Sequence, residues 1–423
     1  MDWIAEPARM KSSRIRMPDG VTLILVATAI AGGCGYLANA LVGATRSSAD
    51  YVVFGIFWSA IYLVISALSG VQQEVTRATR PFTGAGLRAG VSPIRNFGVG
   101  SSVLTAVILI ASGPAWIGAV FPRDDWAFIL PIAIGGASYV VVAVICGSLY
   151  GLSLWRAVAL MSACDGILRL TGVLVVVAVS GGMGALVWAV VLPFPLTPLI
   201  LWWFIRRDVV GRAVLDVGYG VLTWNVLRTV VASVATGIMI SGFPLLLKAT
   251  SPGASDTALG ALIFAINLVR APLVIVVLSL QSYLVVRFRN APERSLALFA
   301  RLTVLVVAAA VVLAAIAWFL VPPILDLFRR GYGLDGPVVA GLVGTAGLLG
   351  VLCLSGPLAL ARSQHAVFTA GWVGGAVVSV LMLLVPGDLA TRMLLSLALG
   401  PLLGASIHIV GVLYSPRRSA QAD

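Results

Sequence analysis

The sequence predicts an all-α integral membrane protein with twelve transmembrane helices. Of its 423 residues, 60% are hydrophobic and only 10% are charged, whereas soluble domains carry roughly 25% charged residues. The charges lie between apolar runs that are each long enough to cross the roughly 30 Å hydrocarbon layer of a bilayer. The alternation of polar and apolar residues that a membrane β-barrel needs does not occur, so helices are the expected spanning elements.

Twelve apolar runs follow one another along the chain. The first follows Lys and Arg residues and contains Ala-Asn-Ala at 38–40, as a signal peptide would. Its apolar run is longer than a signal's and eleven more follow, so an uncleaved anchor is expected. Pro193, Pro195 and Pro198 should break the hydrogen bonding of the sixth run, and Pro244, Pro272, Pro357 and Pro401 interrupt later runs. The expected spans are 20–43, 51–73, 98–119, 127–149, 157–179, 183–204, 221–247, 258–283, 300–321, 336–361, 366–385 and 390–414.

The distribution of positive charge predicts the orientation. With the N-terminus in the cytoplasm, 19 of the 28 Lys and Arg residues fall in cytoplasmic segments, six fall in outside loops and three lie within spans. Cytoplasmic loops of membrane proteins carry such an excess of Lys and Arg. Both termini are therefore expected in the cytoplasm, and the net charge of +12 is assigned to the membrane surface, with no nucleic-acid partner expected.

Two short matches indicate an internal repeat. LSGVQQEVTR (68–77) and LSLQSYLVVR (278–287) share Leu, Ser and Arg at an offset of 210 residues, and CGSLYGL (146–152) matches CLSGPLAL (353–360) at an offset of 207. These offsets are close to half the chain and relate equivalent helices of two six-helix halves. Since six is even, both halves should point the same way across the membrane, as a parallel repeat.

The repeat predicts two lobes around a central cavity. The N-terminal lobe is expected at 1–209 and the C-terminal lobe at 210–423, with the polar segment 205–220 as the hinge between them. No loop is long enough to form a domain outside the membrane. Binding is therefore expected within or between the helices.

Four charged residues lie more than one helical turn inside the expected spans: Asp165, Arg169, Arg228 and Arg270. A charge at the centre of a bilayer costs at least about 2.5–3.5 kcal/mol, so each needs a partner or water. Asp165 and Arg169 are four residues apart on one helical face and can neutralise each other. A purely structural pair is therefore as well supported as a role in binding.

Arg228 and Arg270 have no acidic residue within a turn. Each follows an asparagine by three residues, Asn225 and Asn267, which places an amide and a guanidinium on one helical face. These arginines could pair with backbone carbonyls or with Asp165. Alternatively, they line a cavity of net positive charge, where the planar guanidinium suits phosphate or carboxylate. The candidate cavity residues are Arg270, Arg228, Arg169, Asp165, Asn225 and Asn267.

A second polar group follows the apolar run of the second span. Gln72, Gln73 and Glu74 precede Arg77 at its cytoplasmic end. Because the repeat places polar residues and an arginine at the end of the eighth span too, the two exits are expected to face each other. The three residues are candidates for the cytoplasmic mouth, although an ordinary interfacial helix end explains them as well.

Several absences narrow the class of protein. Lys11 follows Met10 and Lys248 follows Leu247, so no Gly-Lys-Ser/Thr motif for nucleotide hydrolysis exists. No Cys or His pair has the spacing of metal ligands. No cofactor, metal or catalytic residue is therefore expected, and the chain is predicted not to be an enzyme.

Three segments resemble a known family. LVRAPLVIVVLSLQSYL (268–284) resembles the eighth helix of the polysaccharide branch of the MOP superfamily (multidrug, oligosaccharidyl-lipid and polysaccharide exporters), in which an Arg-x-Pro pair precedes an apolar run. Residues 49–77 are similar to the second helix of that branch, and 327–336 to the loop after its ninth helix, except that Arg-Arg stands where the family has small residues. The resemblance is to the Wzx-like and MurJ-like flippases.

This resemblance implies a V-shaped pair of lobes that moves polyprenyl-(pyro)phosphate-linked saccharides to the outer leaflet by alternating access, for cell-envelope glycan synthesis. Arg270 occupies the family's arginine position. The implied location is a bacterial plasma membrane, and the implied partners are the lipid bilayer, a polyprenyl-linked glycan lipid and envelope glycosyltransferases. Two alternatives stay open: a MATE-like, Na⁺- or H⁺-coupled exporter of organic cations, which would need cavity carboxylates, and a membrane enzyme or scaffold of glycan assembly.

Overall fold

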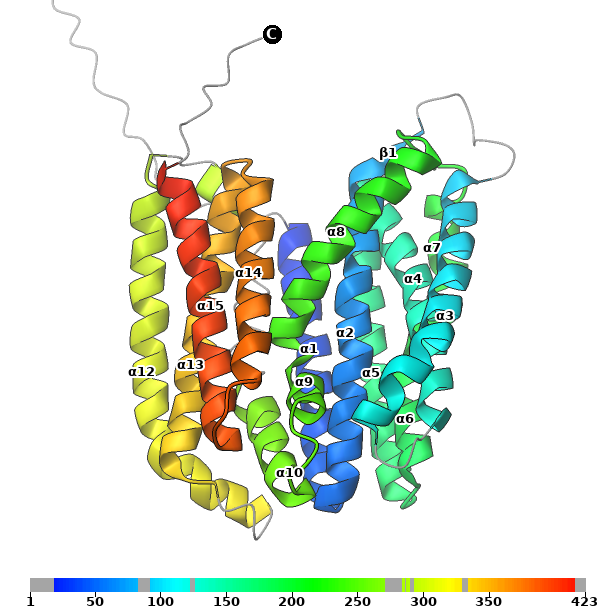
Figure 1. Cartoon of the computed structure of the whole chain (residues 1–423). Coiled ribbons are helices and arrows are strands. Elements are labelled where there is room, and N and C mark those ends of the chain that lie inside the picture. The colour runs from blue at the N-terminus through cyan, green and yellow to red at the C-terminus, as the bar shows by residue number, and fades with distance from the viewer. Residues whose placement is uncertain are drawn as a thin grey trace, which may run out of the picture.

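The protein is a bundle of membrane-spanning helices arranged in two groups (Figure 1). The computed structural model describes residues 19–82, 92–121, 126–270, 284–285, 287–289, 293–328 and 334–414. Within these residues, eleven helices are long and apolar enough to cross a membrane. They coincide with eleven of the twelve expected spans. The remaining span, 258–283, begins as a described helix, but residues 271–283 lie outside the described residues.

The two groups follow the order of the chain. The N-terminal group is α1 (Asp19–Thr45), α2 (Ser48–Ala78), α3 (Pro93–Val120), the 3₁₀ turn η1 (Trp126–Phe128), α4 (Ile129–Gly151), α5 (Trp155–Ala178), α6 (Met183–Val191) and α7 (Pro193–Val209). The helix α8 (Tyr219–Ile240) crosses between the groups (Figure 1). The C-terminal group is α9 (Phe243–Ala249), α10 (Asp256–Ala265), the π-helix η2 (Ile266–Arg270), α12 (Ser295–Phe328), α13 (Gly336–Ala361), α14 (His365–Leu383) and α15 (Leu389–Tyr414).

Prolines divide two of the spans, as expected from the sequence. By contrast, Pro357 and Pro401 lie inside the continuous helices α13 and α15, and Pro272 lies outside the described residues. The sixth span consists of α6 and α7, which meet at Leu192 immediately before Pro193. The seventh span breaks after Ile240, and Pro244 lies in the first turn of α9. Proline has no N–H to continue the helical ladder, so the backbone groups freed at each break need other partners.

Three turns between helices share one conformation. Ser153, between α4 and α5, and Ser363, between α13 and α14, both have φ of 58° and are 210 residues apart. The next residue in each turn donates its N–H to the carbonyl five positions earlier, from Leu154 at 2.8 Å and from Gln364 at 3.0 Å. Ser180, between α5 and α6, has the same turn, with φ of 54° and a bond from the Gly181 N–H at 2.8 Å. The turn is therefore not specific to the 210-residue offset, and the repeat stays a prediction.

Small residues allow α14 and α15 to pack backbone to backbone. A Cβ atom added at Gly400 would lie 1.9 Å from Ser379 Oγ and 2.7 Å from the carbonyl oxygen of Gly375. The hydroxyls of Ser379 and Ser396 each donate to the other's carbonyl, at 3.0 and 2.6 Å. Close approach through glycine and serine is the usual basis of helix association in lipid.

The segment 205–220 is not a free linker. Its strand β2 (Ala213–Leu215) pairs antiparallel with β1 (Thr79–Pro81), which directly follows α2. Asp216 donates its N–H to the carbonyl of Ala78 at 2.9 Å. The sequence did not predict this two-stranded sheet, which ties the start of α8 to the end of α2.

The change from one group to the other takes place within α8. Its first half packs in the N-terminal group, where Leu222 and Val226 contact the buried Val71 and Val75 of α2. Its second half packs in the C-terminal group, where Ala235 and Met239 join a cluster formed by α13, α14 and α15. The helix slants accordingly from β1 to α9 in Figure 1.

Candidate functional site

Asp165 and Arg169 form an ion pair within α5. Nη2 of Arg169 donates to both carboxylate oxygens of Asp165, at 2.8 and 2.7 Å. The guanidinium also donates to the Tyr62 hydroxyl and lies 4.5 Å from the centre of the Phe194 ring. The Arg169 side chain is only 2% exposed and that of Asp165 is 28% exposed. The predicted mutual neutralisation is confirmed, and Arg169 is enclosed in the N-terminal group in this conformation.

Arg228 is exposed and lies on the face of α8 directed toward the C-terminal group. At 100° per residue, Ala232, Ala235 and Met239 continue the stripe that begins at Arg228. These three are at most 9% exposed, and Ala235 and Met239 pack against α13 and α14. Arg228 itself is exposed, and it has no acidic partner among the described ion pairs. Of the candidate arginines with a described side chain, it alone is available to an anion.

Asn225 and Thr229 lie one turn apart on either side of Arg228. Asn225 is partly buried, and its carbonyl accepts the Thr229 hydroxyl at 2.9 Å. No side-chain bond of Asn225 occurs among the described residues, so its amide is available beside Arg228.

Arg270 and Asn267 belong to η2. Arg270 is the last residue of this π-helix, and its side chain lies outside the described residues. The amide of Asn267 donates to the Tyr51 hydroxyl at 3.3 Å. Asn267 is therefore bonded to α2 of the N-terminal group.

The three candidates for the cytoplasmic mouth differ in exposure. Gln73 is exposed, Gln72 is partly buried, and the Glu74 side chain is only 14% exposed. Glu74 accepts from Arg77 Nε at 2.8 Å and from the Thr229 hydroxyl of α8 at 3.0 Å. The structure therefore places Glu74 of α2 against Thr229 of α8, the residue next to Arg228. The sequence did not predict this contact.

The contact between α2 and α8 at this level is unusually close. A Cβ atom added at Gly70 would lie 2.8 Å from the backbone nitrogen of Val230. One turn further along, Glu74 bonds to Thr229. The N-terminal half of α8 is thus held to α2 by a glycine contact, a carboxylate and the β1–β2 sheet.

The break between α8 and α9 is bridged by Ser59 of α2. Its hydroxyl donates to the carbonyl of Ser241 at 2.6 Å and accepts the N–H of Leu245 at 3.2 Å. Ser59 is 1% exposed, so the two backbone groups would otherwise be buried without partners, which is costly. Sequence reasoning missed this residue, because a serine in an apolar run carries no signal of its partner.

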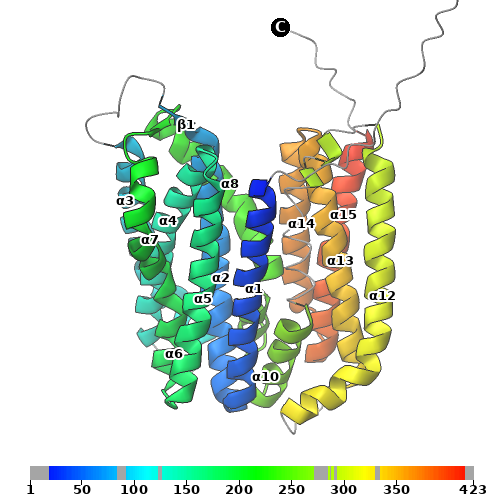
Figure 2. The same cartoon turned by 180° about the vertical axis from the view of Figure 1, so that it is seen from behind.

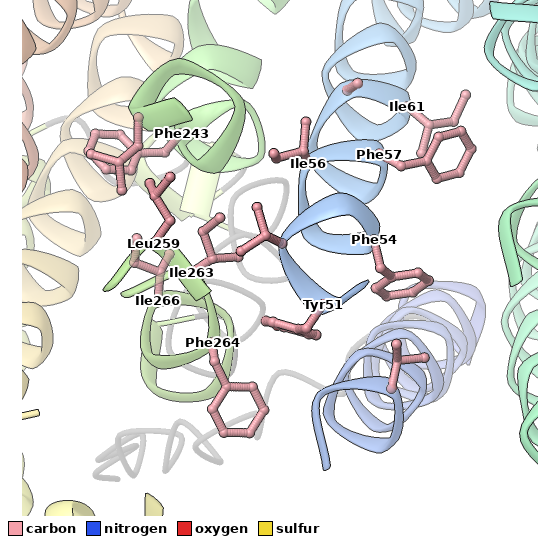
Figure 3. Packing of buried hydrophobic residues seen from close by; sticks show 14 of the residues in the cluster. Tyr51, Phe54, Ile56, Phe57, Ile61, Phe243, Leu259, Ile263, Phe264 and Ile266 are labelled. Atoms are coloured by element: carbon pink, nitrogen blue, oxygen red, sulfur yellow. The ribbon is translucent and has the colours of Figure 1, made fainter. Parts of the chain in front are cut away.

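The two groups are joined at the end of the molecule where α10 lies. This end is opposite to the ends at which α1 begins and α15 finishes (Figures 1 and 2). Ile263 and Phe264 of α10 point toward α1 and α2 (Figure 3), and both are at most 2% exposed. Phe264 meets the Tyr51 ring edge-on at 5.4 Å between centroids. The charge distribution predicts that this is the outer end of the protein, so the described contacts between the groups lie at the predicted outer side.

The Ile263 and Phe264 side chains pack against glycines of α2 and α1. A Cβ atom at Gly43 would lie 2.3 Å from the Phe264 ring, and one at Gly55 would lie 2.7 Å from Ile263. The Tyr51 hydroxyl, which accepts from Asn267, donates to Asn39 of α1 at 2.7 Å. Apolar packing against the two glycines and a chain of hydrogen bonds together join the two helix groups at this end.

No cluster of metal-ligating side chains exists among the described residues. The expectation that the chain holds no metal stays a prediction.

Comparison with known proteins identifies the fold. No protein-family profile matches the chain. The uncharacterized protein Rv1510 of Mycobacterium tuberculosis is 29% identical over 403 residues, covering 94% of this chain and 92% of the relative. The uncharacterized protein Rv3630 of the same organism is 29% identical over 398 residues, covering 93% and 91%.

Solved structures are more informative about architecture. An inward-facing MATE family transporter of the MOP superfamily matches with a TM-score of 0.62 at 14% identity, over 93% of this chain and 97% of that one. An outward-facing MATE transporter matches with a TM-score of 0.60 at 16% identity, over 93% and 94%. A MOP superfamily transporter from Pyrococcus furiosus, described as having a binding pocket of reverse polarity that suggests a different function, matches with a TM-score of 0.55 at 17% identity, over 93% and 94%. The chain is an all-α multi-pass membrane protein with the MATE/MOP fold.

Proposed function

We propose that this chain is a flippase that moves polyprenyl-(pyro)phosphate-linked saccharides from the cytoplasmic to the outer leaflet by alternating access, for cell-envelope glycan synthesis. The MATE/MOP fold supports transport as the general activity, because its structural neighbours are transporters. The charged side chains that lie between the two helix groups support a substrate with an anionic head group.

One observation carries the choice of an anionic head group: Asp165 inside a span and Glu74 at the end of α2 are each paired with arginine, whereas Arg228 is not paired with an acid among the described residues. Asp165 is bonded to Arg169 and Glu74 to Arg77. Arg228 is exposed on the face of α8 directed toward the C-terminal group. The described part of this region thus offers a guanidinium to an anion and no uncompensated carboxylate to a cation.

Arg228 would bind the phosphate together with Arg270. The amide of Asn225, and the exposed Gln73 at the end of α2, would accept and donate hydrogen bonds to sugar hydroxyls nearer the cytoplasm. Glu74 would act indirectly, since it fixes Thr229 beside Arg228. The polyprenyl tail would stay in the bilayer, because its transfer from lipid into an apolar protein interior would gain little free energy.

A MATE-like exporter of organic cations is the second candidate. It is favoured by the structural neighbours, which include multidrug MATE transporters, and by the partial exposure of Asp165 at 28%. A cation would have to compete with Arg169 for that carboxylate, since Arg169 occupies both of its oxygens. The reverse-polarity pocket described for the Pyrococcus furiosus protein is a precedent for a MOP fold without the usual pocket charge.

The proposal implies a location and partners. The chain would lie in a bacterial plasma membrane with both termini in the cytoplasm, in contact with the polyprenyl-linked glycan lipid and with envelope glycosyltransferases that make and use it. The excess of Lys and Arg on one side supports this orientation.

Depletion of the protein in its host, followed by lipid extraction, tests the proposal. We expect a polyprenyl-linked glycan to accumulate on the cytoplasmic side of the membrane. Unchanged lipid pools with altered efflux of cationic drugs would favour the second candidate instead.

Complementation of the depleted cells tests the residues. Arg228→Gln and Arg270→Gln should fail to complement at normal protein levels. Arg207→Gln is the matched control, because Arg207 is exposed at the end of α7 and is not a residue of the candidate site, and it should complement fully. Full activity of both cavity variants would remove the cationic-site mechanism.

A further inference from the structure

Trp224 is an exposed tryptophan that lies one helical turn before Arg228. Both residues belong to the N-terminal half of α8. Trp224 is 62% exposed, and Arg228 is exposed as well. Four residues of an α-helix advance about 6 Å along its axis and turn by about 40°. The indole and the guanidinium therefore lie on nearly the same face of α8.

This face of α8 is the one that meets the C-terminal group further along the helix. At 100° per residue, Trp224 lies about 20° from Ala235 and about 60° from Met239 around the helix axis. These two residues pack in the cluster formed with α13, α14 and α15. Leu222 and Val226, which pack against α2, lie about 160° away from Trp224. Trp224 is therefore on the side of the C-terminal group, but the described residues leave most of it uncovered.

The indole of Trp224 is available to a ligand. It makes no ring contact, cation–π contact or hydrogen bond within the described part of the chain. Trp203 of α7 differs in this respect, because the Arg206 guanidinium lies 3.7 Å from the centre of its ring. Arg228 does not cover Trp224 in this way, although it is only one turn away.

The residues around Trp224 match the parts of a sugar phosphate. Arg228 offers a guanidinium to the phosphate, and the Asn225 amide on the other side of Arg228 can bond to hydroxyl groups. The face of an indole ring is apolar and carries partial negative charge. One face of a pyranose ring carries C–H groups, which are apolar and slightly positive. An open indole one turn from a phosphate-binding arginine therefore suits the sugar that is bonded directly to the phosphate.

We propose that Trp224 is a specificity-determining residue that stacks on the sugar next to the phosphate. The inference rests on the proposed function, in which Arg228 binds the phosphate of a lipid-linked saccharide. Arg228 alone cannot distinguish this lipid from the bare carrier, because both carry phosphate. Stacking on Trp224 gains free energy only when a sugar is present, so it favours the loaded carrier.

Titration of the full chain in nanodiscs tests the inference with two probes. They are undecaprenyl diphosphate and the same lipid linked to a disaccharide, and the ratio of their dissociation constants measures the preference for the sugar. Trp224→Leu removes the aromatic face but keeps an apolar side chain. Trp203→Leu is the matched control, because Trp203 is also exposed, at 66%, and also lies near an arginine.

The unsubstituted protein should bind the disaccharide lipid more tightly than the bare carrier. Trp224→Leu should reduce this preference about two- to tenfold, the range of stacking contacts made by aromatic side chains. Its affinity for the bare carrier should not change. Trp224→Phe should keep part of the preference, because it retains an aromatic face, and Trp203→Leu should keep all of it.

Three results would overturn the inference in distinguishable ways. Equal affinities of the unsubstituted protein for the two lipids would exclude a sugar contact and leave the phosphate site in place. A preference that Trp224→Leu retains, or a loss of affinity for both lipids alike, would assign Trp224 to contact with the bilayer. Binding of neither lipid by the unsubstituted protein would contradict the proposed function itself.

Discussion

Replacement of Asp165 by asparagine should strongly destabilise the protein. The change removes the carboxylate that binds Arg169 through two hydrogen bonds at 2.8 and 2.7 Å. The guanidinium would keep the Tyr62 hydroxyl and the Phe194 ring. It would nevertheless remain a 2% exposed cation without a counter-charge.

The magnitude follows from the burial of the two partners. Removal of one member of a buried ion pair costs about 3–5 kcal/mol, because the other charge is left uncompensated. Asp165 is 28% exposed, so water can partly replace its carboxylate. We therefore expect a loss of about 3 kcal/mol, at the lower end of that range.

The assay is SDS-induced unfolding in mixed micelles, followed by tryptophan fluorescence. The matched control is the double variant Asp165→Asn with Arg169→Gln, which removes both charges. It should recover most of the lost stability, since replacing a whole buried pair by neutral groups is often nearly neutral. A single Asp165→Asn variant within about 0.5 kcal/mol of the unsubstituted protein, the usual range for surface changes, would refute the reasoning.

The same two variants separate the candidate functions. A flippase that uses Arg228 and Arg270 should regain transport when the double variant regains stability. A cation exporter that needs the Asp165 carboxylate should stay inactive in the stable double variant.

Three further predictions concern packing and binding. Gly400→Ala should destabilise the protein by about 1–3 kcal/mol through overpacking, because its Cβ would lie 1.9 Å from Ser379 Oγ. The control Gly344→Ala has nothing within 4 Å of its Cβ and should not destabilise it. Equal unfolding curves for the two variants would contradict the close packing of α14 and α15. Gly70→Ala should push α8 away from α2 and reduce transport in liposomes, because its Cβ would lie 2.8 Å from the Val230 nitrogen. The control Gly100→Ala has no atom within 4 Å of its Cβ. Unchanged transport rates in both variants would show that the α2–α8 contact does not matter for transport. Arg228→Gln should weaken undecaprenyl phosphate binding by about tenfold or more, the value of a charge-assisted hydrogen bond, and equal affinities measured by titration in nanodiscs would exclude contact with the phosphate.

Much of the fold follows from the sequence because the bilayer restricts the possibilities. Apolar runs of sufficient length must be helices, since backbone groups in lipid need internal partners. The internal repeat, which two short matches predict, stays a prediction. The helix breaks at Pro193 and Pro244 followed from the sequence, because proline cannot continue the ladder, but Pro357 and Pro401 lie inside unbroken helices.

Other parts of the fold depend on contacts that no local pattern records. The pairing of residues 79–81 with 213–215 joins two three-residue strands that are 132 or more positions apart, and neither has a period that predicts a strand. The division of α8 between the two groups likewise depends on which of its faces meets a partner, and on how far along the helix.

The candidate site was only partly predictable for the same reason. Spacing of four residues was enough to pair Asp165 with Arg169, since both lie on one helix. The bond from Glu74 to Thr229 and the bridge from Ser59 to the α8–α9 break join different helices. Such partners become visible only when α2 and α8 are placed side by side.

Transbilayer movement of a labelled undecaprenyl diphosphate-linked disaccharide in liposomes tests the central claim most directly. The account predicts faster movement with the protein than without it, and loss of that increase in Arg228→Gln with Arg270→Gln, while Arg207→Gln retains it. Movement unaffected by the protein, together with uptake of an organic cation that the double arginine variant preserves, would contradict the account.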